Sequence, residues 1–111
     1  MIYLASPYSS PSHQIRVQRY NQVMEKASQM VKEGRIVYSP IIHFHEMAER
    51  HNLPTDYAFW KYLCEQMLFK ADSLALYKMP GWEESVGMSG EIELARKINL
   101  PIEEIIYVPR S

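Results

Sequence analysis

Residues 85–91 combine hydroxyls, glycines and a carboxylate in a pattern that could bind and react with an anionic ligand. The segment contains Gly87 and Gly90, follows a strand-like run, and reaches Glu91 where a helical pattern begins. Strand, glycine-bearing loop and helix start form a common anion site, because free backbone N–H groups and the positive helix end converge there. A carboxylate in this place is either a first-turn residue that complements the helix dipole or a reacting group.

Short apolar runs predict the strands that would carry this segment. They cover residues 2–5, 35–40 and 72–77, and residues 100–108 form either one bent strand or two short ones. Apolar residues at three- and four-residue steps predict helices between them. These helices cover residues 13–33, about 55–70, and 91–99, whereas residues 41–53 are predicted only as a loop with one or two helical turns.

Alternation of strands and helices predicts an α/β fold, a three-layer flavodoxin-like or Rossmann-like sandwich with a parallel sheet of four to five strands. With 111 residues, the chain is expected to form a single domain over residues 1–111. Ligands of such sheets bind at the carboxyl ends of the strands. The residues expected to meet at that edge are Tyr3, Ser6, Ser9, Ser39, His43, Asp72, Ser85, Gly87, Ser89 and Glu91.

Several common sites are missing from the sequence. It contains neither the phosphate loop GxxxxGK[ST] nor the dinucleotide pattern GxGxxG. Ser6 and Ser85 both lack the context of a hydrolase nucleophile elbow.

Three segments in the same order resemble the signature segments of the nucleoside 2-deoxyribosyltransferase superfamily. They are residues 2–6, residues 71–77, and the pattern Ser85-x-Gly87-x-x-x-Glu91. Residues 3–9, 39–43 and 80–82 narrow the resemblance to a short bacterial and phage branch, similar to the 2′-deoxynucleoside 5′-phosphate N-hydrolases. The resemblance covers nearly the whole chain.

This resemblance implies cleavage or exchange of the N-glycosidic bond of a 2′-deoxynucleoside or its 5′-monophosphate. Glu91 would be the nucleophile that forms a glycosyl-enzyme intermediate, and Tyr3 would hydrogen-bond it. Asp72 would hold the sugar hydroxyl or assist proton transfer to the departing base. A position at the helix start would also favour the ionised form of Glu91.

Ser85 departs from the transferases, which usually carry an aspartate six positions before the nucleophile. The family's monophosphate hydrolases resemble this chain in having a serine there. A serine hydroxyl can donate to a phosphate, whereas an aspartate would repel it. We therefore expect a nucleotide substrate, with Ser85, Ser89 and either Ser6 or Ser9 at the phosphate.

Each assignment has a structural alternative. Glu91 could only complement the helix dipole, Asp72 could cap a strand start, and Tyr3 could be an ordinary strand aromatic. At the level of function, the alternatives are a base-exchange transferase, a nucleotide-binding domain without turnover and, more distantly, an enzyme that cleaves NAD.

Histidines and aromatic residues add further candidates. His43 is expected at the cleft in contact with base or phosphate, and Trp82, in a predicted turn, could cover a base. The set His43, His45, Glu46 and His51 lacks the order His-Glu-x-x-His, so neither a metal nor another cofactor is expected. Cys64 is interpreted as a packed thiol. Tyr57, Phe59 and Trp60 are interpreted as core or subunit interface.

Composition limits the partners. A net charge of −1 argues against a long nucleic acid or a membrane surface as partner. A single cysteine fits a reducing cytoplasm. We expect a cytoplasmic protein that binds a small nucleotide or nucleoside. Relatives in the resembled family complete their sites with a neighbouring subunit, so a homodimer or larger homo-oligomer is expected. Met24 and Met30, or Trp60 and Met67, fit either its interface or an ordinary core.

Overall fold

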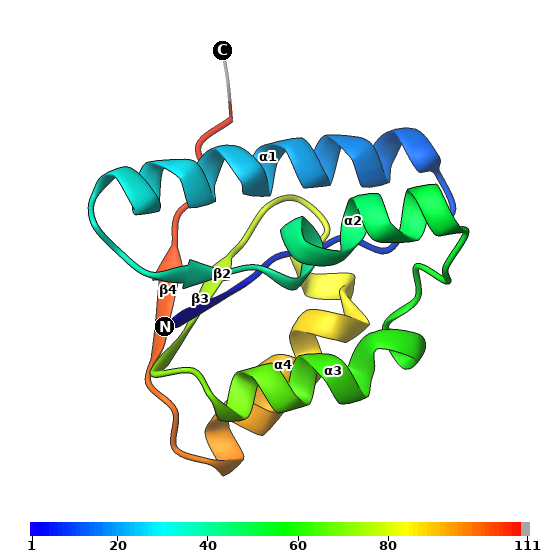
Figure 1. Ribbon diagram of the computed structural model, residues 1–111. Coiled ribbons are helices and arrows are strands. Elements are labelled where there is room, and N and C mark those ends of the chain that lie inside the picture. The colour runs from blue at the N-terminus through cyan, green and yellow to red at the C-terminus, as the bar shows by residue number, and fades with distance from the viewer. Residues whose placement is uncertain (110–111) are drawn as a thin grey trace.

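Four parallel strands form the centre of the computed structural model, which describes residues 1–109 (Figure 1). The strands are β1 (Ile2–Ala5), β2 (Val37–Tyr38), β3 (Ser73–Tyr77) and β4 (Ile102–Ile105), in the order β2-β1-β3-β4. Tyr3 of β1 pairs with Tyr38 on one side and with Leu74 on the other. The predicted α/β fold with a parallel sheet is confirmed, with four strands.

Helices cover both faces of this sheet and make the fold a three-layer sandwich of the Rossmann or flavodoxin type. Helices α1 (His13–Lys32) and α2 (Pro40–His51) lie on one side, and α3 (Tyr57–Phe69) and α4 (Val86–Lys97) on the other (Figure 1). A short 3₁₀ turn, η1 (Trp82–Glu84), precedes α4. No helix within residues 1–109 combines the length and the apolar character needed to cross a membrane.

The two-residue period of a strand decides which layer each β1 side chain enters. Tyr3 packs with Cys64, Leu68 and Met88 in the core beneath α3 and α4. Leu4 points the other way and packs with the core beneath α1 and α2, beside Val23. The Tyr3 hydroxyl is therefore directed into the α3–α4 layer.

Helix α4 begins five residues before the predicted start at residue 91. Ser85 is its N-cap, and the Ser85 Oγ accepts a hydrogen bond from the Met88 N–H at 3.1 Å. Gly87 and Gly90, which suggested a loop, lie inside the first two turns. Glu91 is therefore a residue of the second turn, and the prediction that it lies at the helix start is wrong.

Residues 40–51, left undecided by their periodicity, form the regular helix α2. The Ser39 Oγ caps it by accepting from the Ile42 N–H at 3.2 Å, and Pro40 occupies the first turn, where its missing N–H costs nothing. Asn52 ends it in the left-handed conformation. Proline thus starts a helix here rather than only ending a strand.

Candidate active site

A cavity of about 560 Å³ opens at the carboxyl edge of the sheet. Its volume falls within the range of about 300–1,000 Å³ that is typical of small-molecule sites. The loops after β1 and β3 and the helix α2 that follows β2 all reach it, as expected where the strand order reverses between β1 and β3. The lining includes Ser6, Tyr8, Ser9, Arg19, Phe44, His45, Asp56, Tyr57, Trp60, Cys64, Gly81, Glu84, Ser85, Gly87 and Glu91.

Glu91 is the buried carboxylate of this cavity. Only 5% of the residue is exposed, and the fully buried Tyr3 donates a hydrogen bond from its hydroxyl to the Glu91 Oε2. Tyr3 comes from β1 and Glu91 from α4, so the contact joins the sheet to the helix layer. It fixes one carboxylate oxygen of Glu91.

Burial controls the charge of Glu91. Loss of hydration raises its pKa to about 7, and the hydrogen bond from Tyr3 opposes this rise only in part. The helix start was expected to favour the ionised form of Glu91. That expectation is wrong, because Glu91 lies in the second turn and desolvation dominates.

Tyr3 itself stays protonated. Burial and the neighbouring Glu91 carboxylate both raise the pKa of its phenol far above the ordinary value. The phenol is therefore a permanent hydrogen-bond donor to Glu91. Tyr38, whose ring centroid lies 5.6 Å from that of Tyr3, also has its pKa raised, to about 12, mainly by burial.

The Cys64 thiol lies beside the Tyr3 hydroxyl and lines the cavity. Burial raises its pKa to about 11, with a further contribution from the Glu91 charge, while the hydrogen bond with Tyr3 acts in the opposite direction. A thiol with such a pKa is almost wholly protonated near neutral pH, so it is a poor nucleophile.

Glycines inside α4 make room for an aromatic wall. A Cβ at Gly87 would lie 3.1 Å from the Tyr57 ring, and one at Gly90 would lie 3.2 Å from it. The ring therefore packs directly on the helix backbone next to Glu91. Phe44 and Trp60 stack on each other with centroids 4.4 Å apart and add a second aromatic surface to the cavity.

Arg19 supplies a cation to the cavity. Its Nη1 donates to the backbone carbonyls of Tyr8 at 3.3 Å and Ser9 at 2.9 Å, which holds the guanidinium against the loop after β1. On the other side the guanidinium lies against Gly81, which has a φ of +95° and where a Cβ would come within 2.3 Å of Nη2. Glycine suits this turn because of the backbone angle, and a side chain here would displace the Arg19 guanidinium.

Several predicted site residues are brought together. Ser6, Ser9, Ser85, Gly87 and Glu91 all line the cavity, and Tyr3 lies behind Glu91. The Ser85 hydroxyl accepts the helix-capping bond and keeps its own proton for a ligand. The Ser9 hydroxyl donates to the Thr55 carbonyl at 2.8 Å.

Asp72 does not join them. It precedes β3 and therefore lies at the amino edge of the sheet, opposite the cavity, so its expected place at the carboxyl edge is wrong. Its side chain is 84% exposed and pairs with the amino group of Met1. Asp72 thus fits the alternative of a polar residue at a strand start.

Three other candidates also lie outside the cavity lining. His43 packs its ring against Tyr38 and Phe44, and Ser89 belongs to a shallow surface depression on the outer side of α4. Trp82 packs on the core, with the Lys78 Nζ 4.4 Å from its ring centroid. Each of these residues lies in or close to a sequence motif of the expected site. Such closeness in sequence does not determine where a side chain points.

Other cavity residues went unnoticed in the sequence. Arg19 follows the loop after β1 by two helical turns, so its spacing from that loop was a usable signal. Tyr8 and His45, whose Oη and Nδ1 atoms lie 2.7 Å apart, are separated by 37 residues and gave no such signal. Trp60 and Tyr57, interpreted as core or interface, line the cavity.

Within the part of the chain that the structure describes, no three His, Cys, Asp or Glu side chains gather as a metal site would require. A comparison with curated proteins gives no match. Residues 1–106 match the family described as a domain of unknown function (DUF1937), and because the match spans nearly the whole chain, the protein belongs to that family.

Proposed function

We propose that this protein is an N-glycosidase that hydrolyses 2′-deoxynucleoside 5′-monophosphates. The observation that carries the proposal is the pair Glu91 and Tyr3. A buried carboxylate faces a cavity of nucleotide size, and a phenol that stays protonated holds one of its oxygens. The sequence resemblance to the deoxyribosyltransferase superfamily assigns the same two residues to the reaction centre.

The proposed reaction has two steps. In the first, an oxygen of ionised Glu91 attacks C1′ of the sugar, and the C1′–N bond breaks with its electron pair passing to the base, which takes up a proton. In the second, water displaces the carboxylate from C1′ and loses a proton. The products are free base and 2-deoxyribose 5-phosphate, and Glu91 returns to its ionised form.

Arg19 and Ser85 support a phosphate-bearing substrate. The guanidinium lies on the cavity wall and makes no ion pair with a carboxylate of residues 1–109, so its charge is available to a ligand. Guanidinium groups bind phosphate oxygens strongly and directionally. The Ser85 hydroxyl adds a neutral donor where an aspartate would repel the phosphate.

The aromatic walls suit the other end of a nucleotide. Tyr57, Phe44 and Trp60 present flat surfaces to the cavity, and a planar base can pack against such surfaces. The resemblance implied that Asp72 binds the sugar hydroxyl. In this proposal Asp56 binds it instead. Asp56 lines the cavity at the start of α3, and its carboxylate makes no capping hydrogen bond there.

The test is release of free base. The protein is incubated separately with deoxynucleoside monophosphates, deoxynucleosides and NAD, and products are separated by chromatography. We expect base from the monophosphates, loss of release in Glu91→Gln, and no loss in Glu93→Gln, an exposed residue of the same helix. Absence of base from every substrate would refute the enzymatic proposal and leave a nucleotide-binding domain.

The same experiment separates hydrolysis from base exchange. A second free base is added in excess, and the glycosyl intermediate of a transferase would pass to that base in preference to water. The proposed hydrolase gives 2-deoxyribose 5-phosphate at an unchanged rate.

The homo-oligomer stays a prediction. Met30 is buried in the core, so the stripe of Met24 and Met30 fits the alternative of an ordinary core. Exposed Phe59, Tyr62, Leu63 and Phe69 of α3 form a more suitable face.

A further inference from the structure

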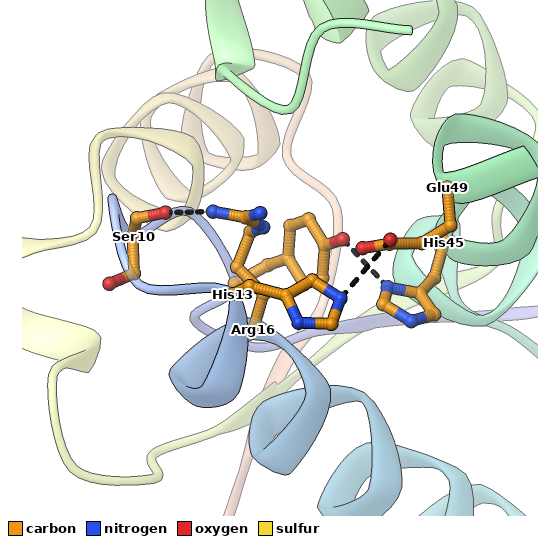
Figure 2. A network of polar contacts seen from close by, with 6 residues as sticks. Ser10, His13, Arg16, His45 and Glu49 are labelled. Carbon is orange, nitrogen blue, oxygen red and sulfur yellow. Dashed lines mark hydrogen bonds and ion pairs between the residues drawn. The ribbon is translucent and has the colours of Figure 1, made fainter. Parts of the chain in front are cut away.

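His45 is held on several sides at the wall of the cavity. It lies in α2, is 7% exposed, and stacks on the Tyr20 ring with centroids 4.1 Å apart and planes 21° apart. Its Nδ1 lies 2.7 Å from the Tyr8 hydroxyl oxygen. Figure 2 shows His13 of α1 facing Glu49 of α2 beside His45, with Arg16 turned to Ser10. A ring packed in this way has one orientation.

Burial favours the neutral form of the His45 ring. Burial lowers the pKa of His45, and the nearby His13 and Arg16 lower it further, while Glu49 and Glu46 act in the opposite direction. The His13 Nε2 and the Glu49 Oε2 lie 3.2 Å apart, so Glu49 is already engaged. The neutral ring carries one proton, on either Nδ1 or Nε2.

The contact with Tyr8 links the tautomer of this ring to the phenol. The Tyr8 hydroxyl oxygen and the His45 Nδ1 lie within hydrogen-bond distance, and which of them donates depends on the tautomer of the ring. An imidazole nitrogen is a stronger acceptor than a phenol oxygen, which favours donation from Tyr8 to Nδ1. That arrangement has the ring proton on Nε2.

The Nε2 nitrogen is the ring atom left for a ligand. Within residues 1–109, it makes no hydrogen bond to protein, and the only fully buried side-chain polar atoms without a partner are the Ser6 Oγ and the Arg16 Nε. His45 also belongs to the cavity lining. The site therefore contains a neutral N–H donor whose tautomer depends on Tyr8, another residue of the cavity wall.

We propose that the His45 Nε2–H donates a hydrogen bond to an acceptor atom of the leaving base, and that Tyr8 is the positioning residue that fixes this donor. The inference rests on the proposed N-glycosidase function. As the C1′–N bond breaks, its electron pair moves onto the base, and the ring nitrogens and carbonyl oxygens of the base become more negative. A fixed donor then binds the transition state more tightly than the substrate. His45 keeps its proton, and the base takes its own from water.

Substrates that differ in leaving group test this role. His45→Phe keeps an aromatic ring on Tyr20 and removes the donor, whereas His45→Gln keeps an N–H donor. We expect His45→Phe to lower kcat/KM about 10- to 100-fold for the natural monophosphates. The loss should be less than about threefold for the 4-nitrophenyl glycoside of 2-deoxyribose 5-phosphate, because nitrophenolate needs no donor. His45→Gln should recover part of the loss.

Controls separate this role from a structural one. A merely structural role of His45 would lower kcat/KM for both substrates by the same factor and would overturn the proposal. Tyr8→Phe should show the same dependence on leaving group with a smaller loss. His51→Phe, at the exposed end of α2, should leave kcat/KM unchanged for both substrates.

Nitrogen NMR of the histidine rings gives a second readout that does not need turnover. We expect the His45 signal, identified by its loss in His45→Gln, to show protonated Nε2, and to shift when deoxynucleoside monophosphate saturates the protein. Protonated Nδ1, or an unmoved signal at saturation, overturns the inference whether or not base is released. A shifted signal without base release refutes only the hydrolase proposal. Failure of any monophosphate to bind refutes both.

Discussion

The Tyr3 hydroxyl donates a hydrogen bond to the Glu91 carboxylate across 88 residues of sequence, and both side chains are buried. Two effects meet at this carboxylate. Burial raises the pKa of Glu91, and the Tyr3 hydrogen bond lowers it, with burial the larger effect. The ionisation of Glu91 therefore falls near neutral pH, where a nucleophilic carboxylate must become charged to react.

Removal of the Tyr3 hydroxyl should move the acid limb of the activity profile. In Tyr3→Phe the carboxylate loses the donor that stabilises its charge, so the pKa of Glu91 should rise by about one to two units. The measurement is kcat/KM against pH for a deoxynucleoside monophosphate. Tyr62→Phe, an exposed tyrosine on α3, is the matched control. An unchanged acid limb in Tyr3→Phe would show that Glu91 is not the titrating group.

Glu91 should also make the folded state less stable as pH rises. Its carboxyl has a pKa of about 7 in the folded chain and 4.5 as its ordinary value, so between these values the folded state binds more protons than the unfolded state. The favourable contribution is fully present below about pH 4.5 and is lost as pH rises through 7. The full loss is about 3 kcal/mol in the free energy of unfolding.

Glu91→Gln tests this dependence because it keeps the shape and removes the charge. The variant should be more stable than the parent at pH 8, and the difference should shrink towards pH 5. Urea unfolding at several pH values measures it. Glu93→Gln loses only an ion pair with Lys97 at the surface. Its free energy of unfolding should therefore depend on pH as that of the parent does. A Glu91→Gln variant less stable than the parent at pH 8 would contradict the raised pKa.

Arg19 should distinguish nucleotides from nucleosides. Arg19→Ala is expected to raise KM for monophosphates about 10- to 100-fold, because a charge-assisted contact to phosphate is lost. For a deoxynucleoside, which has no phosphate, the KM of Arg19→Ala should rise much less. Any rise there reports only the loosening of the loop that Arg19 holds through the carbonyls of Tyr8 and Ser9. Arg19→Lys should restore part of the affinity. Equal effects on both substrates would limit Arg19 to a structural role.

Cys64 should be slow to react although it lines the cavity. With its thiol pKa raised to about 11, the thiolate fraction at pH 8 is far smaller than that of a free cysteine. Alkylation by iodoacetamide should be at least about a hundredfold slower than that of a small thiol, and it should reach the ordinary rate on unfolding in urea. Fast alkylation of the folded protein would mean that the thiol is neither buried nor hydrogen-bonded as described.

The sequence was sufficient for the fold because each layer has a local signal. Short apolar strands alternate with amphipathic helices, and this pattern alone requires parallel strands with helices on both faces. Ser85 and Ser39 show where such reasoning falls short. Serine is a common N-cap, and both residues cap a helix in the structure. However, Gly87 suggested a loop after Ser85, and Pro40 suggested only the end of a strand after Ser39.

The site was predicted in part for a similar reason. Residues that directly follow a strand, such as Ser6 and Ser9 after β1, were placed at the cavity correctly. Asp72 was misplaced because it precedes its strand, and the two ends of a parallel strand lie on opposite edges of the sheet. The contact between Tyr8 and His45 depends on the packing of α1 against α2, and no local pattern reports it.

Attack of Glu91 on C1′ would leave a covalent intermediate, and this intermediate can be captured. The protein is mixed with a deoxynucleoside monophosphate, quenched in acid within a turnover and digested for mass spectrometry. We expect a deoxyribose 5-phosphate ester on the peptide that carries Glu91, and none in Glu91→Gln. Release of base at the parental rate by Glu91→Gln, with no ester on any peptide of the parent, would contradict it.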